Sequence, residues 1–190
     1  MRIKVYLITL WKLMDPLYYS CTRLQLLKDT KMQSSIFRVR LTCYKGQDIT
    51  LTDGTVFRKN DVLIKIHLHN AQVLHELSGM NNELRRAMIL YKKVQDSLPL
   101  LASYIRQHKN AHEIKGIIGI TLLNKGCERL GFESYSITSR IYKSFKQLAL
   151  YPIYLLSTTN PYVLGKNAPS PKYLFMSKAN LFDKYGTTAD

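Results

Sequence analysis

The sequence lacks a long apolar stretch and is poor in both cysteine and acidic residues. No run of about 18 uncharged apolar residues occurs, so a conventional membrane-spanning helix is not expected. The three cysteines stand far apart and cannot all pair, which excludes a disulfide framework and a cysteine-rich zinc ribbon. A reducing compartment is therefore expected. The chain of 190 residues is long enough to bury one sizeable core.

Signatures of catalytic chemistry are also missing. The sequence contains no Gly-x-Ser-x-Gly nucleophile turn, no phosphate-binding P-loop, no His-Glu-x-x-His zinc motif and no Cys–His signature. Cys127 falls on the apolar side of its predicted helix, which is typical of a core cysteine rather than a reactive one. We therefore predict no catalytic residues and no cofactor, and the sequence favours a protein that is not an enzyme.

What the sequence has in excess is positive charge. Lysine and arginine number 28 against 13 acidic residues, which gives a formal net charge of +15, and the excess is spread along the whole chain. A basic globular protein attracts anions such as nucleic acid, anionic lipid or a phosphorylated polymer. Solubility alone is the other explanation of such a charge.

The N-terminal residues predict an amphipathic helix and not a cleavable signal peptide. The apolar run at residues 5–11 is short, Lys12 and Asp15 end it, and no small-residue cleavage site follows. Apolar residues at helical spacing are Ile3, Leu7, Leu10 and Met14. A second helix is expected from Pro16 to about Leu27. These helices either cover a sheet or lie on a membrane, so we expect a cytoplasmic protein, peripheral on the inner face of the membrane in the second case.

Residues 36–69 predict an antiparallel β-meander. Apolar and polar residues alternate along residues 36–44 and again along 61–69, as in strands with one buried face. Between them, residues 48–58 predict two short strands joined at Asp53 and Gly54, a pair typical of a type I′ turn.

Helices are expected over residues 71–109. A short helix at 71–77 precedes a longer one, which Pro99 is expected to kink or divide near Ser97. The apolar face of the longer helix is predicted to hold Leu84, Met88, Tyr91, Leu98, Leu101 and Ile105.

The rest of the chain predicts an alternation of strands and helices. Strands are expected at residues 114–120, 132–137 and 173–176, and helices are expected to end at Gly131, to start at Thr138 or Ser139 and to cover 178–185. Residues 151–171 hold four prolines and are expected to be irregular, and the apolar residues 148–156 are a second candidate for contact with a membrane. The fold class is therefore α+β, with an N-terminal amphipathic helical segment at 1–34 and a single α+β domain at 35–190.

Cationic and titratable side chains are predicted to share one face of the sheet. Two arginines alternate along the first long strand, and a lysine and two histidines alternate along the last. If the two strands pair, all five side chains point the same way. Arginine binds phosphate or carboxylate through paired N–H groups, and histidine gains charge near neutral pH. The pattern indicates either an anion-binding face or an ordinary solvated face of a sheet. The candidate residues are Arg38, Arg40, Lys65, His67, His69 and Asn70.

A zinc site on this face would need a third ligand beside His67 and His69. The sequence spacing brings none of the candidates near them, so we expect no metal site. Those candidates are His75, His112 and Glu113.

A glycine-containing segment suggests a second kind of anion site. Residues 115–121 and the helix expected after them are faintly similar to the pyrophosphate-binding turn of acyl-CoA-dependent N-acyltransferases, in which backbone N–H groups approach phosphate. The spacing departs from that motif, because Gly116 directly follows Lys115 and Gly119 precedes Ile120 and Thr121. Two glycines that permit close packing of a buried strand are the alternative.

Several motifs in combination resemble one family. They are residues 37–40, 51–55, 59–61, 66–70, 116–121, 128–132 and 173–186. Together they resemble the YkoP-like domain of sporulating bacilli, which is similar to a domain fused to the C-terminus of some bacterial polysaccharide deacetylases. The similarity covers roughly residues 35–186. It implies a context of sporulation and the bacterial cell envelope but no settled activity, and this chain has no deacetylase domain from which an enzymatic role could be carried over.

The leading hypothesis from the sequence is a small, basic, non-catalytic module that binds an anionic group. Its expected partners are an anionic lipid head group or an envelope polysaccharide. The alternative is an enzyme similar to acyl-CoA-dependent N-acyltransferases. Non-specific binding of nucleic acid is a third hypothesis that depends on charge alone, because the sequence has no recognisable nucleic-acid-reading motif.

Overall fold

The structure is a computed structural model of the chain, and it describes residues 24–28, 34–68, 70–77, 80, 82–122, 126–157 and 170–186. For residues 28, 34, 70, 71, 74, 75 and 151–157 it describes the backbone only. The helix predicted at the N-terminus falls on residues 1–23 and lies outside the described residues.

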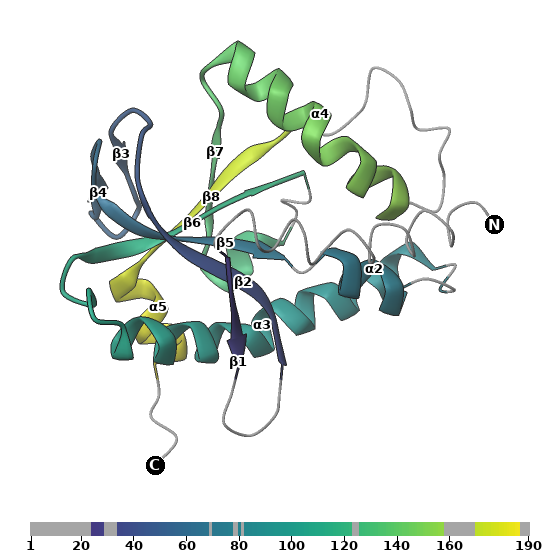
Figure 1. Cartoon of the computed structure of the whole chain (residues 1–190), viewed down its shortest axis with the longest axis horizontal. Coiled ribbons are helices and arrows are strands. Elements are labelled where there is room, and N and C mark those ends of the chain that lie inside the picture. The colour runs from purple at the N-terminus through teal and green to yellow at the C-terminus, as the bar shows by residue number, and fades with distance from the viewer. Residues whose placement is uncertain are drawn as a thin grey trace.

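A six-stranded sheet forms the centre of the fold (Figure 1). Its strands, in their order across the sheet, are β1 (Gln25–Lys28), β2 (Ser34–Cys43), β5 (Val62–Leu68), β6 (Ile114–Thr121), β8 (Lys172–Ser177) and β7 (Glu133–Ser136). Neighbouring strands are antiparallel except β5 and β6, which are parallel. A parallel pair needs a crossover connection, and the helices between β5 and β6 provide it.

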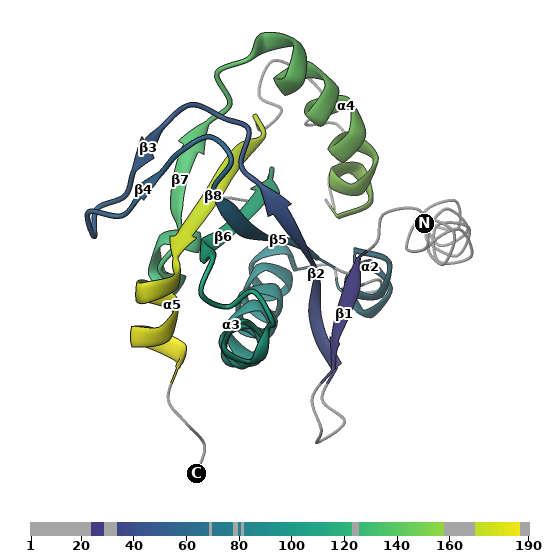
Figure 2. The same ribbon diagram turned by 60° about the vertical axis from the view of Figure 1, so that its left-hand side comes forward.

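Helices cover one face of the sheet. Helix α2 (Asn70–Leu77) and helix α3 (Glu83–Gln107) form the crossover, and α5 (Lys178–Tyr185) follows β8. Figure 2 shows α3 and α5 on the same side of the sheet. Alternate residues of the strands pack against them, and the main core includes Val39, Ile64, Leu98, Leu101, Ile117 and Met176. Burial of these side chains is what holds α3 against the strands.

The opposite face of the sheet is covered by two different elements. At one end lies a hairpin of β3 (Ile49–Thr50) and β4 (Val56–Phe57), which encloses a smaller apolar cluster containing Leu63, Ile118 and Phe175. At the other end lies α4 (Arg140–Ser157), which runs across the sheet in both views (Figures 1 and 2). A short 3-10 helix, η1 (Cys127–Leu130), links β6 to β7.

The predicted α+β class is confirmed, and most predicted elements exist. The antiparallel pairing of the two long strands is present, since Phe37 to Cys43 of β2 pair with Leu68 to Val62 of β5. The simple meander is wrong, because β3 and β4 leave the main sheet and form a sheet of their own. Their turn is not type I′ either. Only Gly54 has a positive φ, of 82°, and Gly54 N–H donates to Leu51 O at 3.0 Å, as in a type I turn followed by a left-handed glycine.

Three expectations for the helices need correction. Residues 25–28 form a strand where a helix was predicted to continue to about Leu27, because this segment pairs with β2 as an edge of the sheet. Helix α3 runs through Pro99 without being divided. Helix α4 includes residues 151–157, which were expected to be irregular.

Candidate anion-binding face

Four of the predicted side chains come together on adjacent strands. In the pairing of β2 with β5, Arg38 lies opposite His67 and Arg40 lies opposite Lys65. Residues directly opposite in an antiparallel pair have their side chains on the same face, with Cβ atoms about 4.5–5.5 Å apart. Lys146 of α4 completes the set, because its charge acts on Lys65 and His67. We refer to Arg38, Arg40, Lys65, His67 and Lys146 as the basic face.

The alternation of the strands explains which way these side chains point. Val39 of β2 and Ile64 of β5 belong to the core beneath α3. The residues that alternate with them along each strand therefore point to the opposite face of the sheet. That face is the one over which α4 lies. The sequence pattern thus predicted the direction of the arginines, Lys65 and His67 correctly.

Lys146 was not among the predicted site residues. Helix α4 places it one turn after Tyr142, whose ring stacks on Tyr173 of β8 at a centroid distance of 6.4 Å. Residues four apart lie on the same side of a helix, so Lys146 and Tyr142 share the side that faces the sheet. The helical period was readable in the sequence, but no local signal showed which element this side would cover.

Burial, and then the neighbouring charges of the basic face, lower the pKa of two of its members. Burial, together with the charges of Lys146 and Arg40, lowers the pKa of Lys65 to about 8. Burial, together with the charges of Lys65, Arg40, Lys146 and Arg38, lowers the pKa of His67 to about 3. At neutral pH, His67 is therefore neutral, and Lys65 holds its proton against repulsion from its neighbours.

No acidic side chain lies on the elements that build this face. The sequences of α4 and of the strands β2, β5, β6 and β8 contain no aspartate or glutamate. Arg38 nevertheless has an exposed fraction of only 6%. His67 Nε2 is buried and has no hydrogen-bond partner within the described part of the chain. A concentration of positive charge attracts anions, so the arrangement suits a bound anion.

Two tyrosine hydroxyls adjoin the basic face. Tyr142 of α4 and Tyr173 of β8 are hydrogen-bonded to each other, and Arg40 acts electrostatically on Tyr142. Burial raises the pKa of both hydroxyls, so both keep their protons at neutral pH. They add neutral hydrogen-bonding groups beside the charged ones.

Of the other residues predicted for this face or as zinc ligands, the structure describes the side chains of His112 and Glu113 only. The side chains of His69, Asn70 and His75 lie outside the described residues. His112 pairs instead with Glu113, at 3.5 Å between Nε2 and Oε1, in an exposed turn before β6. Among the residues that the structure describes, no three His, Cys, Asp or Glu side chains lie close enough to hold a metal ion.

Residues 115–121 do not form the predicted phosphate-binding turn, because they lie within strand β6. Gly116, Gly119 and Thr121 lie within β6 and pair with β8, and Lys115 forms an ion pair with Asp61 at 2.7 Å. A Cβ on Gly116 would lie 2.5 Å from Met176 O. The glycine is therefore needed for close approach of two strands, which leaves no loop to surround a phosphate.

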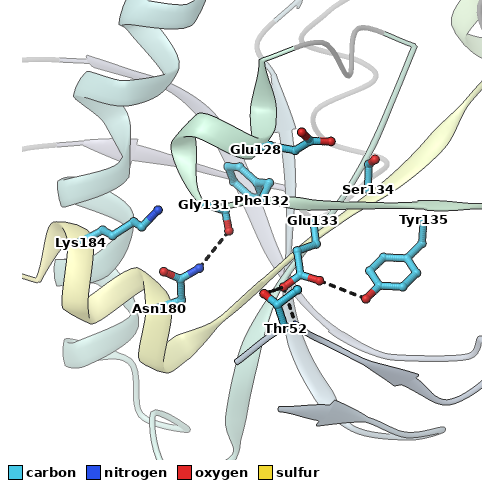
Figure 3. Close-up of a pocket in the computed structure, with 9 residues that line it drawn as sticks. All are labelled: Thr52, Glu128, Gly131, Phe132, Glu133, Ser134, Tyr135, Asn180 and Lys184. Carbon is cyan, nitrogen blue, oxygen red and sulfur yellow. Dashed lines mark hydrogen bonds between the residues drawn. The ribbon is translucent and has the colours of Figure 1, made fainter. Parts of the chain in front are cut away.

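A polar cavity of about 480 Å³ lies elsewhere, between β7, η1 and α5 (Figure 3). Several of its polar groups are hydrogen-bonded to one another. Thr52 donates to Glu133 Oε1 from its N–H at 2.8 Å and from its hydroxyl at 2.6 Å, and Asn180 Nδ2 donates to Gly131 O at 3.0 Å. Glu133 thus fastens the β3–β4 hairpin to β7.

The described helices include none that is both long and apolar enough to cross a bilayer. Cys127 is half-buried beside the main core, and burial together with Glu128 raises the pKa of its thiol to about 11. A thiol with such a pKa is protonated at neutral pH and is a poor nucleophile, in agreement with its interpretation as a core cysteine.

Fold and site together define a class, namely a small α+β protein with a basic face between its sheet and one helix. Residues 4–185 match the YkoP domain family, and the chain belongs to that family. A protein of Bacillus subtilis (strain 168) named "Uncharacterized protein YkoP" is 45% identical over 183 residues, which cover 96% of this chain and 98% of the relative. No solved structure matches the chain. The family predicted from motifs in residues 35–186 is thus confirmed, and the match also includes the N-terminal segment.

Proposed function

We propose that this protein is a non-catalytic module of a bacterial sporulation or cell-envelope system that binds an anionic group at the basic face. The ligand would carry a phosphate or a carboxylate, as an anionic lipid head group or an envelope glycan does. The observation that carries the proposal is the gathering of Arg38, Arg40, Lys65 and Lys146 around a buried, neutral His67, on two strands and a helix whose sequences contain no acidic residue.

The energetics of the basic face support a bound anion. Like charges directly opposite each other in a sheet destabilise it, and Arg40 lies opposite Lys65. A sheet face that served only for solubility would be mixed in sign and open to water, whereas Arg38 is buried. An anion between the two arginines and Lys65 would replace repulsion by attraction, with the arginines as paired donors.

The test is calorimetric titration of the full chain with inorganic pyrophosphate at low salt. Wild type should bind, and K65Q should bind at least about tenfold more weakly, since a charged hydrogen bond contributes on the order of 1.5–3 kcal/mol. The matched control is K59Q, which removes the same charge from an exposed turn. Equal affinities of wild type and K65Q would refute the proposed site. Salt-dependent binding of random DNA that neither variant alters would favour the nucleic-acid hypothesis.

An acyl-CoA-dependent acyltransferase is a second candidate, and the divergence of the parallel strands favours it. Ladder pairs between β5 and β6 end at Lys65 and Ile118, although the strands continue to Leu68 and Thr121. Beyond Lys65 and Ile118, β5 and β6 form no further ladder pairs with each other. An extended ligand that carries amide groups can form hydrogen bonds with the backbone at such a strand edge. Ligands also favour the carboxyl ends of parallel strands. Coenzyme A has such an amide-containing arm, and its phosphates would lie near the basic face.

The two candidates are separated by comparing coenzyme A with adenosine 3′,5′-bisphosphate, which lacks the amide-containing arm. If the arm pairs with the diverging strands, coenzyme A should bind at least about tenfold more tightly, since several hydrogen bonds would be added. If the two compounds bind equally, the anion alone is recognised and the acyltransferase candidate fails.

A further inference from the structure

In the part of α4 whose side chains are described, residues 140–150, large apolar side chains face solvent and polar ones face the sheet. Ile141, Phe145 and Leu148 follow one another at helical spacing and have exposed fractions of 86%, 61% and 74%. On the opposite side of the same helix, Tyr142 stacks on Tyr173 and Lys146 joins the basic face. A surface helix normally buries its apolar side, so this orientation requires a cause. We refer to Ile141, Phe145 and Leu148 as the α4 stripe.

We propose that the α4 stripe docks onto the surface of an anionic lipid bilayer. The inference rests on the proposed function, and it names lipid as the source of the anionic group. An interfacial helix places its apolar side among the acyl chains and its basic residues toward the head groups. The sequence of α4 fits that description, because it has three basic residues in its first seven positions and none after Lys146, and it has no acidic residue.

Charge complementarity favours an anionic bilayer over other occupants. The strands beneath α4 are as free of acidic residues as the helix itself, and the whole chain carries a net charge of +15. A bilayer rich in anionic lipid has a negative surface potential that attracts such a surface. A second copy of this chain would instead bring two positively charged surfaces together across the stripe.

Position links the stripe to the basic face. The stripe belongs to α4, the helix that covers the basic face, and Nζ of Lys146 lies 5.6 Å from the centroid of the Phe145 ring. A bilayer in contact with the stripe would therefore place anionic head groups close to Lys146, the member of the basic face that adjoins the stripe. Apolar insertion and electrostatic attraction are the two signals that together give stable binding at a membrane surface.

The test is co-sedimentation of the full chain with vesicles of phosphatidylglycerol or of phosphatidylcholine. Wild type should bind phosphatidylglycerol vesicles, bind them more weakly as salt is raised, and bind phosphatidylcholine vesicles poorly. The triple variant I141S/F145S/L148S should lose at least about tenfold in affinity for phosphatidylglycerol vesicles, because the apolar contribution is removed.

The chain supplies a matched control on the other side of the sheet. Leu84 and Met88 of α3 have exposed fractions of 71% and 63%, so L84S/M88S removes similar exposed apolar groups from a different surface. This double variant should bind vesicles within about twofold of wild type. Circular dichroism and thermal unfolding confirm that each variant is folded.

Any of three results would overturn the inference. The first is that the triple variant binds phosphatidylglycerol vesicles as tightly as wild type does, and the second is that wild type binds both kinds of vesicle equally. The third result is that wild type is a dimer and the triple variant is a monomer. The pyrophosphate titration distinguishes this failure from that of the proposed function. The triple variant should still bind pyrophosphate as wild type does, because no residue of the basic face is changed. If it loses pyrophosphate binding as well, stripe and basic face are not separate surfaces and the inference also fails.

Discussion

Lys65 shows most clearly that the basic face combines buried charge with repulsion between like charges. It lies opposite Arg40, and burial and repulsion lower its pKa from 10.5 to about 8. In the absence of an anion, the folded protein therefore carries a charge that the unfolded chain would hold more easily. Residues that serve binding are often retained at such a cost to stability.

Removing this charge should stabilise the protein. We expect K65Q to raise the melting temperature at low salt by about 2–4 °C, which corresponds to roughly 1 kcal/mol for a chain of this size. Differential scanning calorimetry measures the change, with K59Q as the control expected to stay within about 0.5 kcal/mol of wild type. A lower melting temperature for K65Q would mean that Lys65 stabilises the fold, which contradicts our interpretation.

His67 should make stability depend on pH in a defined window. Its pKa is about 3 in the folded protein, through burial first and the neighbouring cations second, against 6.5 in the unfolded chain. Between these values the unfolded chain binds the extra proton, so stability falls as pH falls from about 6.5 toward 3. Between pH 7 and 4.5 this costs up to about 2.7 kcal/mol.

H67Q removes the titrating group, so its free energy of unfolding should fall less between pH 7 and 4.5 than that of wild type. Urea denaturation at a series of pH values measures both curves. H112Q is the matched control, since the side chain of His112 is 78% exposed, and it should follow the wild-type curve. Parallel curves for H67Q and wild type would show that His67 is not held neutral.

The two glycines of β6 should differ in their tolerance of a methyl group. A Cβ at position 116 would lie 2.5 Å from Met176 O and 2.7 Å from the ring of Phe57, whereas a Cβ at 119 would meet the flexible Ile66 side chain at 3.3 Å. We therefore expect G116A to cost about 1–3 kcal/mol of unfolding free energy and G119A clearly less, as measured by urea denaturation. Equal costs would contradict the strand packing described for β6.

At the scale of elements, one side of α3 packs against the sheet and another is exposed. The core side includes Val94, Leu98, Leu101 and Ile105, while Leu84 and Met88 are exposed. The sequence predicted all but Val94 of these residues for one apolar face. Apolar residues occur on more than one side of α3, so periodicity alone did not identify the side that the strands would cover.

The same substitution at two positions of α3 tests this packing. L98A removes a fully buried side chain and should cost about 2–5 kcal/mol of unfolding free energy. L84A changes a side chain that is 71% exposed and should cost less than about 0.5 kcal/mol. Chemical denaturation of the two variants gives the comparison, and similar costs would refute the orientation of α3.

Alternation along a strand is a local property, and it was therefore readable in the sequence. It predicted β2, β5 and the common face of Arg38, Arg40, Lys65 and His67. What depends on contacts between distant segments was not readable. Residues 25–28 become an edge strand only because β2 is beside them, and the β3–β4 hairpin leaves the main sheet to cover Leu63 and Phe175. Lys146 joins the site only because α4 crosses the sheet.

At the scale of the whole molecule, the basic face and the main core lie on opposite sides of the sheet. The side toward α3 and α5 is an apolar core, and the side toward α4 holds the basic face within acid-free elements. Neither the strand order nor the parallel pairing of β5 with β6 follows from local patterns, because both are set by the long crossover through α2 and α3. The sequence thus indicated a positive face but not what encloses it.

The most direct test of anion binding at the basic face is the apparent pKa of Lys65 in the presence and absence of pyrophosphate. Nuclear magnetic resonance of isotope-labelled lysine side chains measures it, with the Lys65 signal assigned by its loss in K65Q. An anion held at the basic face stabilises the ammonium form, so the pKa should rise from about 8 toward 10.5 when pyrophosphate is added. A Lys65 pKa that stays near 8 while pyrophosphate binds to the protein would place the anion elsewhere and contradict the account.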